Sequence, residues 1–481
     1  MKKLYGFIDN NIKGDYISNK IIICILLVKL IYLIFFVICH HIYVPEDISG
    51  LFVSTGDTGS YFRQIENWIG GASLNTISRM PGIYPIYGPL YFLGGTFFAR
   101  NMLVIIQFGV SVISIVVLGK IGMQLFNNKV IAFSTMLLYA LSSFVSNFDI
   151  MGMMDSLSVS TLILGVYFFL LCKNKKENKW LLYSGFFLIW SFFFREIGIF
   201  AILIIGLTLV YTEYKNYTDF SISFKKILFF GLPVFLFFSI WIIRNYIVTH
   251  KFQPFRPPFS YSAGTVAIRD LVAGWGGYYS DFDGEAEWFL NDHMKEEDFP
   301  FSDKIFTSYY SLDSLIHLRR SYLNTLGETS SMNSEDKVVE EMAIRFKKSY
   351  IKEKPIQFYV FNKIKLYIKL IIPKSYGTMP FPSFQQMNFS QILIKLGFWT
   401  SYGLINILGT IGLIIFLIKR SEYWFALIPL AMITFIIAMG IVEQRYFCPM
   451  FPFYCVFTSY LVFISAQKIR SKKSMEFIPI P

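Results

Sequence analysis

The chain has 481 residues, of which 54% are hydrophobic and only 16% are charged, whereas a soluble domain carries roughly 25% charged residues. This composition excludes disordered, collagen-like and disulfide-scaffold chains, and it predicts a polytopic membrane protein. The formal net charge is +12, but the basic residues cluster in short segments between apolar runs. Membrane proteins place such segments on the cytoplasmic side, so we expect no nucleic-acid partner.

A membrane-spanning helix needs roughly 20 mostly apolar residues, and the sequence contains ten apolar runs that we predict to be spans, of which 180–194 and 197–211 are short. The first is Ile21 to Cys39, and the others lie near 101–119, 130–148, 152–172, 180–194, 197–211, 227–248, 392–418, 422–440 and 447–466. Residues 81–99 are apolar as well, but prolines and glycines interrupt them. If this segment lies at the outer surface, every short basic loop and both termini are cytoplasmic, which is the topology we predict.

These runs divide the chain into three parts. Residues 1–248 form an N-terminal transmembrane module with its first outer loop at 43–100, and residues 392–481 form the last membrane helices and a basic cytoplasmic tail. Between them, we expect residues 249–391 to form an extracytoplasmic domain of mixed structure. Lysines alternate with apolar residues at 356–374, which favours a helix on the membrane surface, although a helix packed on the outer domain fits equally well. The predicted fold class is therefore an all-α membrane bundle of about ten helices, with juxtamembrane helices in the first outer loop.

The first outer loop contains an acidic residue at the start of a predicted helix. Asp57, Tyr61 and Gln64 are spaced four and three residues apart and therefore share one helix face. Asp57 is a candidate helix N-cap, because a carboxylate there accepts hydrogen bonds from free backbone N–H groups. It is also a candidate general base at the membrane surface.

Four motifs occur in order along the chain, and together they resemble a known superfamily. They are Asp57-x-x-x-Tyr61, Arg79-Met-Pro-Gly-Ile-Tyr-Pro, Trp241-Ile-Ile-Arg244-Asn-Tyr and Glu443-Gln-Arg445-Tyr-Phe-Cys-Pro. The pattern is similar to the GT-C superfamily of membrane glycosyltransferases, in particular the branch of protein O-mannosyltransferases and lipid A aminoarabinose transferases. It covers roughly residues 1–250 and 392–470.

The resemblance implies a sugar donor carried on a polyprenyl phosphate, with chemistry at the extracytoplasmic face. It assigns Asp57 as the catalytic carboxylate, which would act as the general base of an inverting hexosyl- or pentosyltransferase. Protein O-mannosyltransferases carry adjacent Asp-Glu at this point, whereas Thr58 follows Asp57 here. The acceptor therefore stays open among a glycan, a lipid and a protein.

Further charged residues are expected near the outer helix ends. Arg244, Arg445 and Arg195 are candidates for binding the donor phosphate, because a guanidinium stays charged and grips phosphate oxygens bidentately. Each is equally explained as an interfacial arginine, or, for Arg195, as the partner of Glu196. The candidates for substrate binding are Tyr61, Glu66, Arg79 and Asp155, the last of which also suits a helix N-cap. The five histidines are scattered, so we expect no required metal or other cofactor.

Two other functions fit a bacterial inner-membrane protein of this layout. A polysaccharide polymerase or O-antigen ligase also combines about ten spans with a large outer loop, but it would depend on outer-loop arginines and a polymer substrate. A transporter of lipid-linked sugars would show inverted repeats and helices broken at mid-membrane. The sequence shows no such repeat, and its polar residues gather towards one membrane face.

Overall fold

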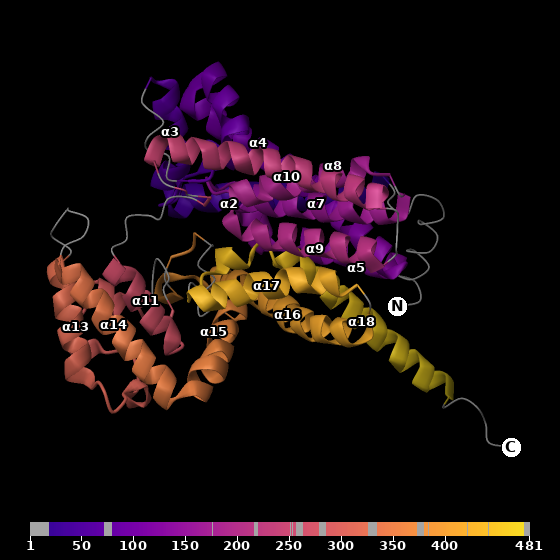
Figure 1. Cartoon of the computed structure of the whole chain (residues 1–481). Helices are drawn as coiled ribbons and strands as arrows, with labels where there is room; N and C mark the ends of the chain where they lie inside the picture. The colour runs from indigo at the N-terminus through magenta and orange to yellow at the C-terminus, as the bar shows by residue number, and fades with distance from the viewer. Residues whose placement is uncertain are drawn as a thin grey trace. The chain divides into compact units, whose positions relative to one another are not determined.

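The computed structural model describes residues 19–71, 79–175, 177–215, 220–250, 252, 254–255, 263–278, 285–325, 334–372, 380–382, 384–420, 422–440 and 442–475. These residues are predominantly helical, which confirms the predicted all-α fold class (Figure 1). The chain divides into two compact units. Unit 1 comprises Met1–Pro257, Ser375–Pro429 and Cys448–Pro481, and unit 2 comprises Pro258–Lys374 and Leu430–Phe447.

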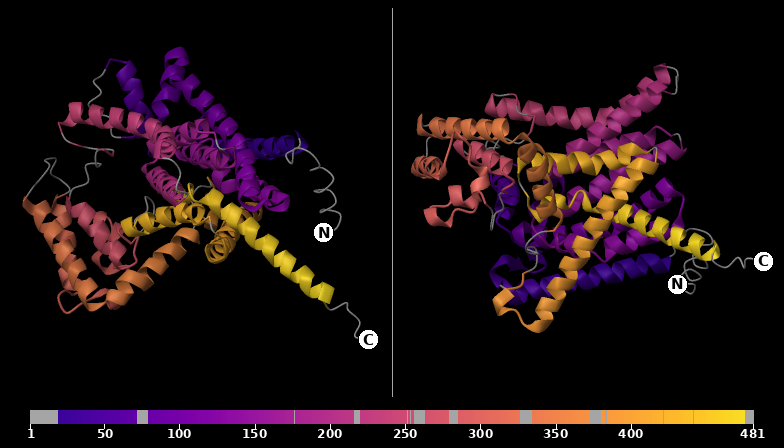
Figure 2. Two further views of the ribbon diagram at one scale, coloured as in Figure 1. Left: turned by 45° about the vertical axis from the view of Figure 1, so that its right-hand side comes forward. Right: turned by 90° about the horizontal axis from the view of Figure 1, so that it is seen from below.

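Unit 1 is a bundle of long apolar helices. Its helices are α2 (Asn19–Tyr43), α3 (Thr58–Ile69), α4 (Tyr84–Phe126), α5 (Lys129–Ala140), α6 (Ser143–Asn147), α7 (Asp155–Lys175), α8 (Lys179–Phe194), α9 (Ile199–Lys215), α10 (Phe220–Thr249), α16 (Phe389–Lys419) and α18 (Phe451–Met475). Helix α8 packs against both α7 and α10, and the three run alongside one another in Figure 1. Helix α18 packs against α16 and extends beyond it in the views of Figure 2.

Among the described residues, six helical stretches are long and apolar enough to cross a membrane. They are Asn19–Tyr43, Pro81–Phe126, Asp155–Lys175, Glu196–Lys215, Ser223–Val248 and Phe389–Lys419. Three shorter apolar helices accompany them, namely Lys129–Ala140, Lys179–Phe194 and Tyr423–Met439. The chain is therefore a multi-pass membrane protein. Each of the ten predicted spans coincides with helical structure, whereas ten crossings and their direction stay a prediction.

The stretch Pro81–Phe126 is bent rather than straight. It has 46 residues and, at about 1.5 Å per residue, would be more than twice as long as the roughly 30 Å hydrocarbon core is thick. Gly95 interrupts α4 with φ 70° and ψ −172°, a conformation that favours glycine because it lacks a Cβ. The proline-rich half before Gly95 is thus a separate helical segment from the half that follows it.

The predicted span 130–148 is two helices. Asn128 caps the first of them, α5, by accepting hydrogen bonds from the backbone N–H groups of Val130 and Ile131. Helix α5 ends at Ala140, and α6 begins at Ser143 after the extended residue Ser142. A single helix was expected because residues 130–148 are apolar on average. The break falls at Leu141 and Ser142, and Ser142 leaves the helical conformation with φ −76° and ψ 110°.

The chain between α2 and α4, which is the predicted first outer loop, contains a short antiparallel hairpin. Strands β1 (Ile48–Ser49) and β2 (Phe52–Val53) pair with Ile48 opposite Val53 and Ser49 opposite Phe52. Val53 also forms a parallel bridge with Met151, which precedes α7. The hairpin therefore fixes the loop to the part of the chain where α7 begins, and α3 follows directly.

The described elements of unit 2 are helices and helical turns. Its described elements are α11 (Ala263–Gly274), α12 (Glu287–Leu290), α13 (Leu312–Thr325), α14 (Ser334–Glu353), the π-helical turn η7 (Gln357–Phe361), α15 (Asn362–Ile371) and the 3₁₀ turns η5 (Glu296–Asp298), η6 (Asp303–Ile305) and η9 (Gln444–Phe447). No strand occurs among its described residues. The apolar helix α17 (Tyr423–Met439) begins in unit 1 and ends in unit 2.

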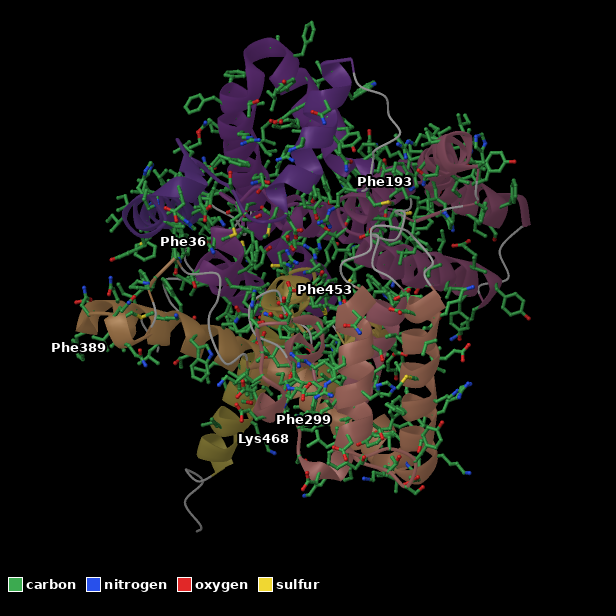
Figure 3. The ribbon with its side chains drawn as sticks, turned by 90° about the vertical axis from the view of Figure 1, so that its left-hand side faces the viewer. Phe36, Phe193, Phe299, Phe389, Phe453 and Lys468 are labelled. Atoms are coloured by element: carbon green, nitrogen blue, oxygen red, sulfur yellow. The ribbon has the colours of Figure 1, made fainter. Side chains whose placement is uncertain are left out.

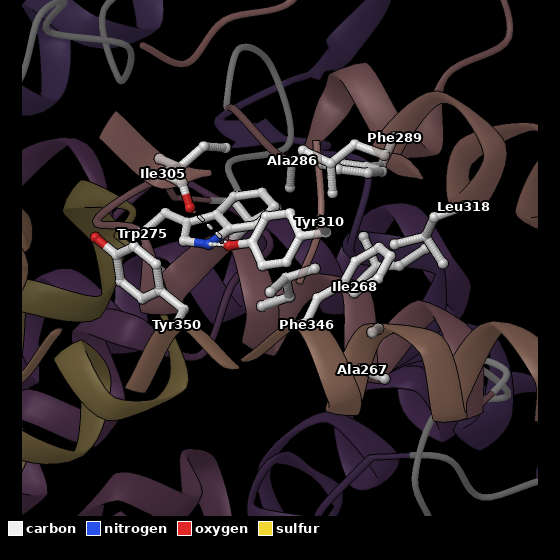
Figure 4. Packing of buried hydrophobic residues seen from close by; sticks show 14 of the residues in the cluster. Ala267, Ile268, Trp275, Ala286, Phe289, Ile305, Tyr310, Leu318, Phe346 and Tyr350 are labelled. Atoms are coloured by element: carbon white, nitrogen blue, oxygen red, sulfur yellow. Dashed lines mark hydrogen bonds between the residues drawn. The ribbon is translucent and has the colours of Figure 1, made fainter. Parts of the chain in front are cut away.

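An aromatic core holds unit 2 together. The Trp275 indole donates a hydrogen bond of 3.0 Å to the Tyr310 hydroxyl, which donates to the Ile305 carbonyl at 2.8 Å (Figure 4). Phe299, marked in Figure 3, lies with its ring 5.0 Å from Trp288 and 6.0 Å from Phe306. Such pairs add roughly 0.5–1.5 kcal/mol each to the burial of apolar surface, so unit 2 has a well-packed core of its own.

Candidate functional site

Asp57 lies directly before α3, but it is not the cap that its position suggested. Its backbone is helical, with φ −85° and ψ −15°, and its side chain makes no capping hydrogen bond to α3. Its carboxylate instead accepts a hydrogen bond of 2.6 Å from Nη2 of Arg79. The N-cap alternative is therefore wrong, and Asp57 is held by a residue 22 positions farther along the chain.

Arg79 makes several contacts with the same stretch of chain. Its Nε donates to the Ser60 hydroxyl at 2.8 Å, and its guanidinium carbon lies 4.6 Å from the centre of the Tyr61 ring. The Asp57 side chain is 27% exposed and the Arg79 side chain 12% exposed. Residues at the start of α3 therefore orient the Asp57–Arg79 pair, and both side chains remain partly accessible to solvent.

The charges of four side chains act on Tyr61, and one of them, Arg79, contacts its ring. Burial raises the pKa of its phenol, the positive charges of Arg79 and Arg195 lower it, and the negative charges of Asp155 and Asp57 raise it. The phenol is therefore neutral at ordinary pH. Charged residues from three places, namely the chain around α3, the start of α7 and the end of α8, thus act on this one side chain.

The second ion pair of this group is buried. Asp155 begins α7 and is inaccessible to solvent, and it accepts a hydrogen bond of 2.5 Å from Nη1 of Arg195. Arg195 adopts an extended conformation, with φ −148° and ψ 125°, between α8 and the 3₁₀ turn η4 (Glu196–Gly198). The sequence offered Glu196 as an alternative partner for Arg195, whereas the structure pairs it with Asp155.

The segment that precedes Asp155 is fixed from several sides. The backbone N–H of Val53 donates to the Ile150 carbonyl at 2.9 Å, and that of Gly152 donates to the Val53 carbonyl at 2.8 Å. The Thr58 hydroxyl donates to the Gly152 carbonyl at 3.3 Å. A Cβ on Gly152 would collide with the Phe52 ring, so only glycine lets the hairpin approach this closely. These contacts set the position of the Asp57 loop relative to α7.

A further buried ion pair supports this segment. Lys29, in the middle of α2, forms a hydrogen-bonded ion pair with Asp149 and also donates to the Ser146 hydroxyl at 2.9 Å. The other carboxylate oxygen of Asp149 accepts a hydrogen bond of 2.6 Å from Ser156. From the sequence alone, Lys29 could reach the membrane surface or pair internally, and it has no assigned role. The structure shows that it pairs.

The remaining candidates have other partners. Glu66 accepts hydrogen bonds from the Tyr87 hydroxyl at 2.7 Å and from Arg100 at 3.3 Å. Arg244 donates to the Asn245 side chain at 2.8 Å and acts electrostatically on Tyr84.

Arg445 belongs to unit 2, where it forms an ion pair of 2.5 Å with Glu443. The structure therefore gives Asp57 a close partner, Arg79, that differs from the three arginines named for the donor phosphate. Among the described residues, no group of three or more His, Cys, Asp or Glu side chains is arranged to hold a metal ion.

Part of the chain matches a known family. Residues 95–241 match the model of the dolichyl-phosphate-mannose-protein mannosyltransferases, which agrees with the GT-C resemblance and lies largely outside the four motifs. No curated protein matches the chain. A solved complex of the archaeal oligosaccharyltransferase AglB from Archaeoglobus fulgidus with an inhibitory peptide and a dolichol-phosphate aligns with 95% of this chain, at 13% identity and a TM-score of 0.44. The alignment covers 52% of the AglB chain, so this chain spans about half the length of that protein.

Proposed function

We propose that this chain, a membrane glycosyltransferase of the GT-C superfamily by its motifs and by the family match of residues 95–241, transfers a sugar from a polyprenyl-phosphate donor at the extracytoplasmic face. The acceptor is a hydroxyl group of a glycan, a lipid or a protein, and the sugar is a hexose or a pentose. The observation that carries this proposal is the partly exposed Asp57 carboxylate, which Arg79 holds in place at the start of α3.

In the proposed reaction, the acceptor oxygen attacks the anomeric carbon as the bond between that carbon and the phosphate oxygen breaks. The acceptor proton passes to the Asp57 carboxylate, and the electron pair of the broken bond stays on the lipid phosphate. A single displacement of this kind inverts the anomeric configuration. A positioned general base contributes typically about 10²–10⁴-fold to such a reaction.

Cations are needed where the phosphate leaves, because charge that develops in the transition state is stabilised by donors already in place. Arg79 is a candidate for this role because it is partly exposed and is held by Asp57 and Ser60. Arg244 and Arg445 stay candidates from the sequence. Asp155 and Tyr61 act through position: the first orients Arg195, and the second lies against the Arg79 guanidinium.

The test is transfer by Asp57→Asn from a labelled polyprenyl-phosphate sugar pool to membrane acceptors. Asparagine keeps the shape of the side chain but cannot take the proton, so we expect a loss of about 10²-fold or more in rate. Glu46→Gln is the matched control, because it removes an exposed carboxylate of the same loop. Unchanged transfer by Asp57→Asn at normal expression would eliminate the proposed base.

A second test concerns the phosphate site. Arg445→Ala should reduce transfer while the protein still folds, and Arg445→Lys should restore it only in part, because an ammonium cannot grip phosphate bidentately. Full rescue by lysine would show that Arg445 contributes only its positive charge and not a bidentate contact with phosphate. Full transfer by the alanine variant would remove Arg445 from the site.

A further inference from the structure

Helix α15 and the π-helical turn before it have two apolar faces. One face is buried in unit 2: Leu366 and Leu370 are almost inaccessible, and the Asn362 amide donates to the Gly274 carbonyl at 2.8 Å and to the Tyr350 hydroxyl at 3.2 Å. This part of the chain is therefore fixed to its own unit. The alternative that the helix packs on the outer domain is correct for this face.

The other face is apolar and exposed. Val360, Ile364 and Ile368 follow one another at four-residue intervals, which places them on one side of the helix, and each is 45–50% exposed. Tyr359 and Phe361 add aromatic rings that are 62% and 57% exposed. Large apolar side chains that gather in this way on a helix indicate a surface that binds an apolar partner.

Lysines lie beside this exposed row. Lys365 is half exposed, and Lys369 forms an ion pair with Glu285 while its ammonium lies 4.5 Å from the centre of the Tyr278 ring. An amphipathic helix with apolar side chains on one side and lysines next to them suits the boundary between lipid headgroups and acyl chains.

Contacts with the end of α17 fix the position of α15 along that helix. The Lys363 ammonium donates to the Ile437 carbonyl at 3.4 Å in the last turn of α17, and α15 contacts the following turn η9. Helix α17 carries no charged residue from Tyr423 to Met439, and a charged residue returns at Glu443, just before η9. Helix α15 is thus held at the end of an apolar helix, next to the point where charged residues return.

We propose that the exposed face of η7 and α15, formed by Tyr359, Val360, Phe361, Ile364 and Ile368, lies in the surface of the lipid bilayer and holds unit 2 against the membrane. This role is independent of sugar transfer. The occupant is lipid because the face is apolar, is about half exposed and lies at the end of the apolar helix α17.

The test uses the full-length protein in nanodiscs of phosphatidylcholine and phosphatidylglycerol. The photoreactive residue benzoylphenylalanine replaces Ile364, and mass spectrometry identifies what it captures on illumination. The negative control is the same residue in place of Glu341, which is exposed on α14 of the same unit. The positive control replaces Leu207, which is 68% exposed on the predicted span α9.

We expect position 364 to give phospholipid adducts at roughly ten times the yield of position 341 and close to the yield of position 207. Capture of protein alone, or a lipid yield as low as that at 341, would overturn the proposal. Both residues of unit 2 are exposed, so these replacements leave its core intact. If the variant at 364 does not fold, position 368 provides the same measurement.

Discussion

The Asp57–Arg79 pair and the two buried ion pairs of unit 1 differ in how completely they are enclosed. Asp57 and Arg79 are 27% and 12% exposed, whereas Lys29 and Asp149 are 1% and 2% exposed and Asp155 is inaccessible. The Lys29–Asp149 pair also has further hydrogen bonds, from Lys29 to Ser146 and from Ser156 to Asp149. The exposed pair is held mainly by residues of one loop.

The difference separates residues that hold the site from residues available for chemistry. A buried charge that loses its partner remains in a medium of low polarity, which is costly, so such pairs resist change. A partly exposed pair costs little to open, because water replaces the lost partner. Asp57 and Arg79 can therefore exchange partners with a substrate, whereas Lys29–Asp149 and Asp155–Arg195 fix the geometry around them.

The largest effect on stability is expected for Lys29→Met. This change leaves the Asp149 carboxylate buried without its cation, and breaking a buried pair in this way typically costs about 3–5 kcal/mol. Thermal unfolding in detergent micelles measures the loss. The double variant Lys29→Met/Asp149→Leu should be closer to the natural protein than the single variant, since no charge is left unpaired. Equal losses in the single and double variants would contradict this explanation.

Arg195→Met should have the next largest effect, about 3 kcal/mol, because it leaves Asp155 unpaired while Arg195 itself is slightly exposed. The same unfolding measurement applies. Arg195→Lys keeps the charge and should lose less. If the lysine and methionine variants unfold at the same temperature, the charge of Arg195 does not stabilise the fold.

Arg79→Met should change stability by at most about 1 kcal/mol, the upper end for partly exposed pairs. Under the proposed function, sugar transfer should nevertheless fall sharply, because Asp57 and the leaving phosphate both lose a guanidinium. Unfolding and transfer are measured on the same preparation. A loss of several kcal/mol would mean that the Asp57–Arg79 pair stabilises the fold as the buried pairs do, and would contradict the distinction drawn between them.

The smallest effect is expected at a surface carboxylate of unit 2. The Ser308 hydroxyl and backbone N–H donate to Glu353 and lower its pKa below its ordinary value of 4.5. A lowered pKa means that the stabilisation is present above 4.5 and is lost as the pH falls through the folded-state value. Glu353→Gln should therefore lower the melting temperature slightly at neutral pH and make no difference in acid. If the difference in melting temperature between Glu353→Gln and the natural protein grew as the pH falls, the pKa of Glu353 would not be lowered in the folded state.

The elements of this protein follow closely from its sequence. Apolar runs and the charges between them predicted the helices, because a helix in a membrane must satisfy its own backbone and present apolar side chains to lipid. The break between α5 and α6 was missed, because the average hydropathy of residues 130–148 is high and conceals the local change of backbone conformation at Ser142. The Asp57 motif indicated where to look for a site.

Only the tertiary structure decided which charges meet. Nothing local in the sequence pairs Asp57 with Arg79 rather than Arg244, or Arg195 with Asp155 rather than Glu196, because ion pairs form between residues that packing brings together from distant positions. Helical periodicity is a short-range property and can be read from neighbouring residues. The choice of partner depends on how α7, α8 and the first outer loop pack, and that is a property of the whole fold.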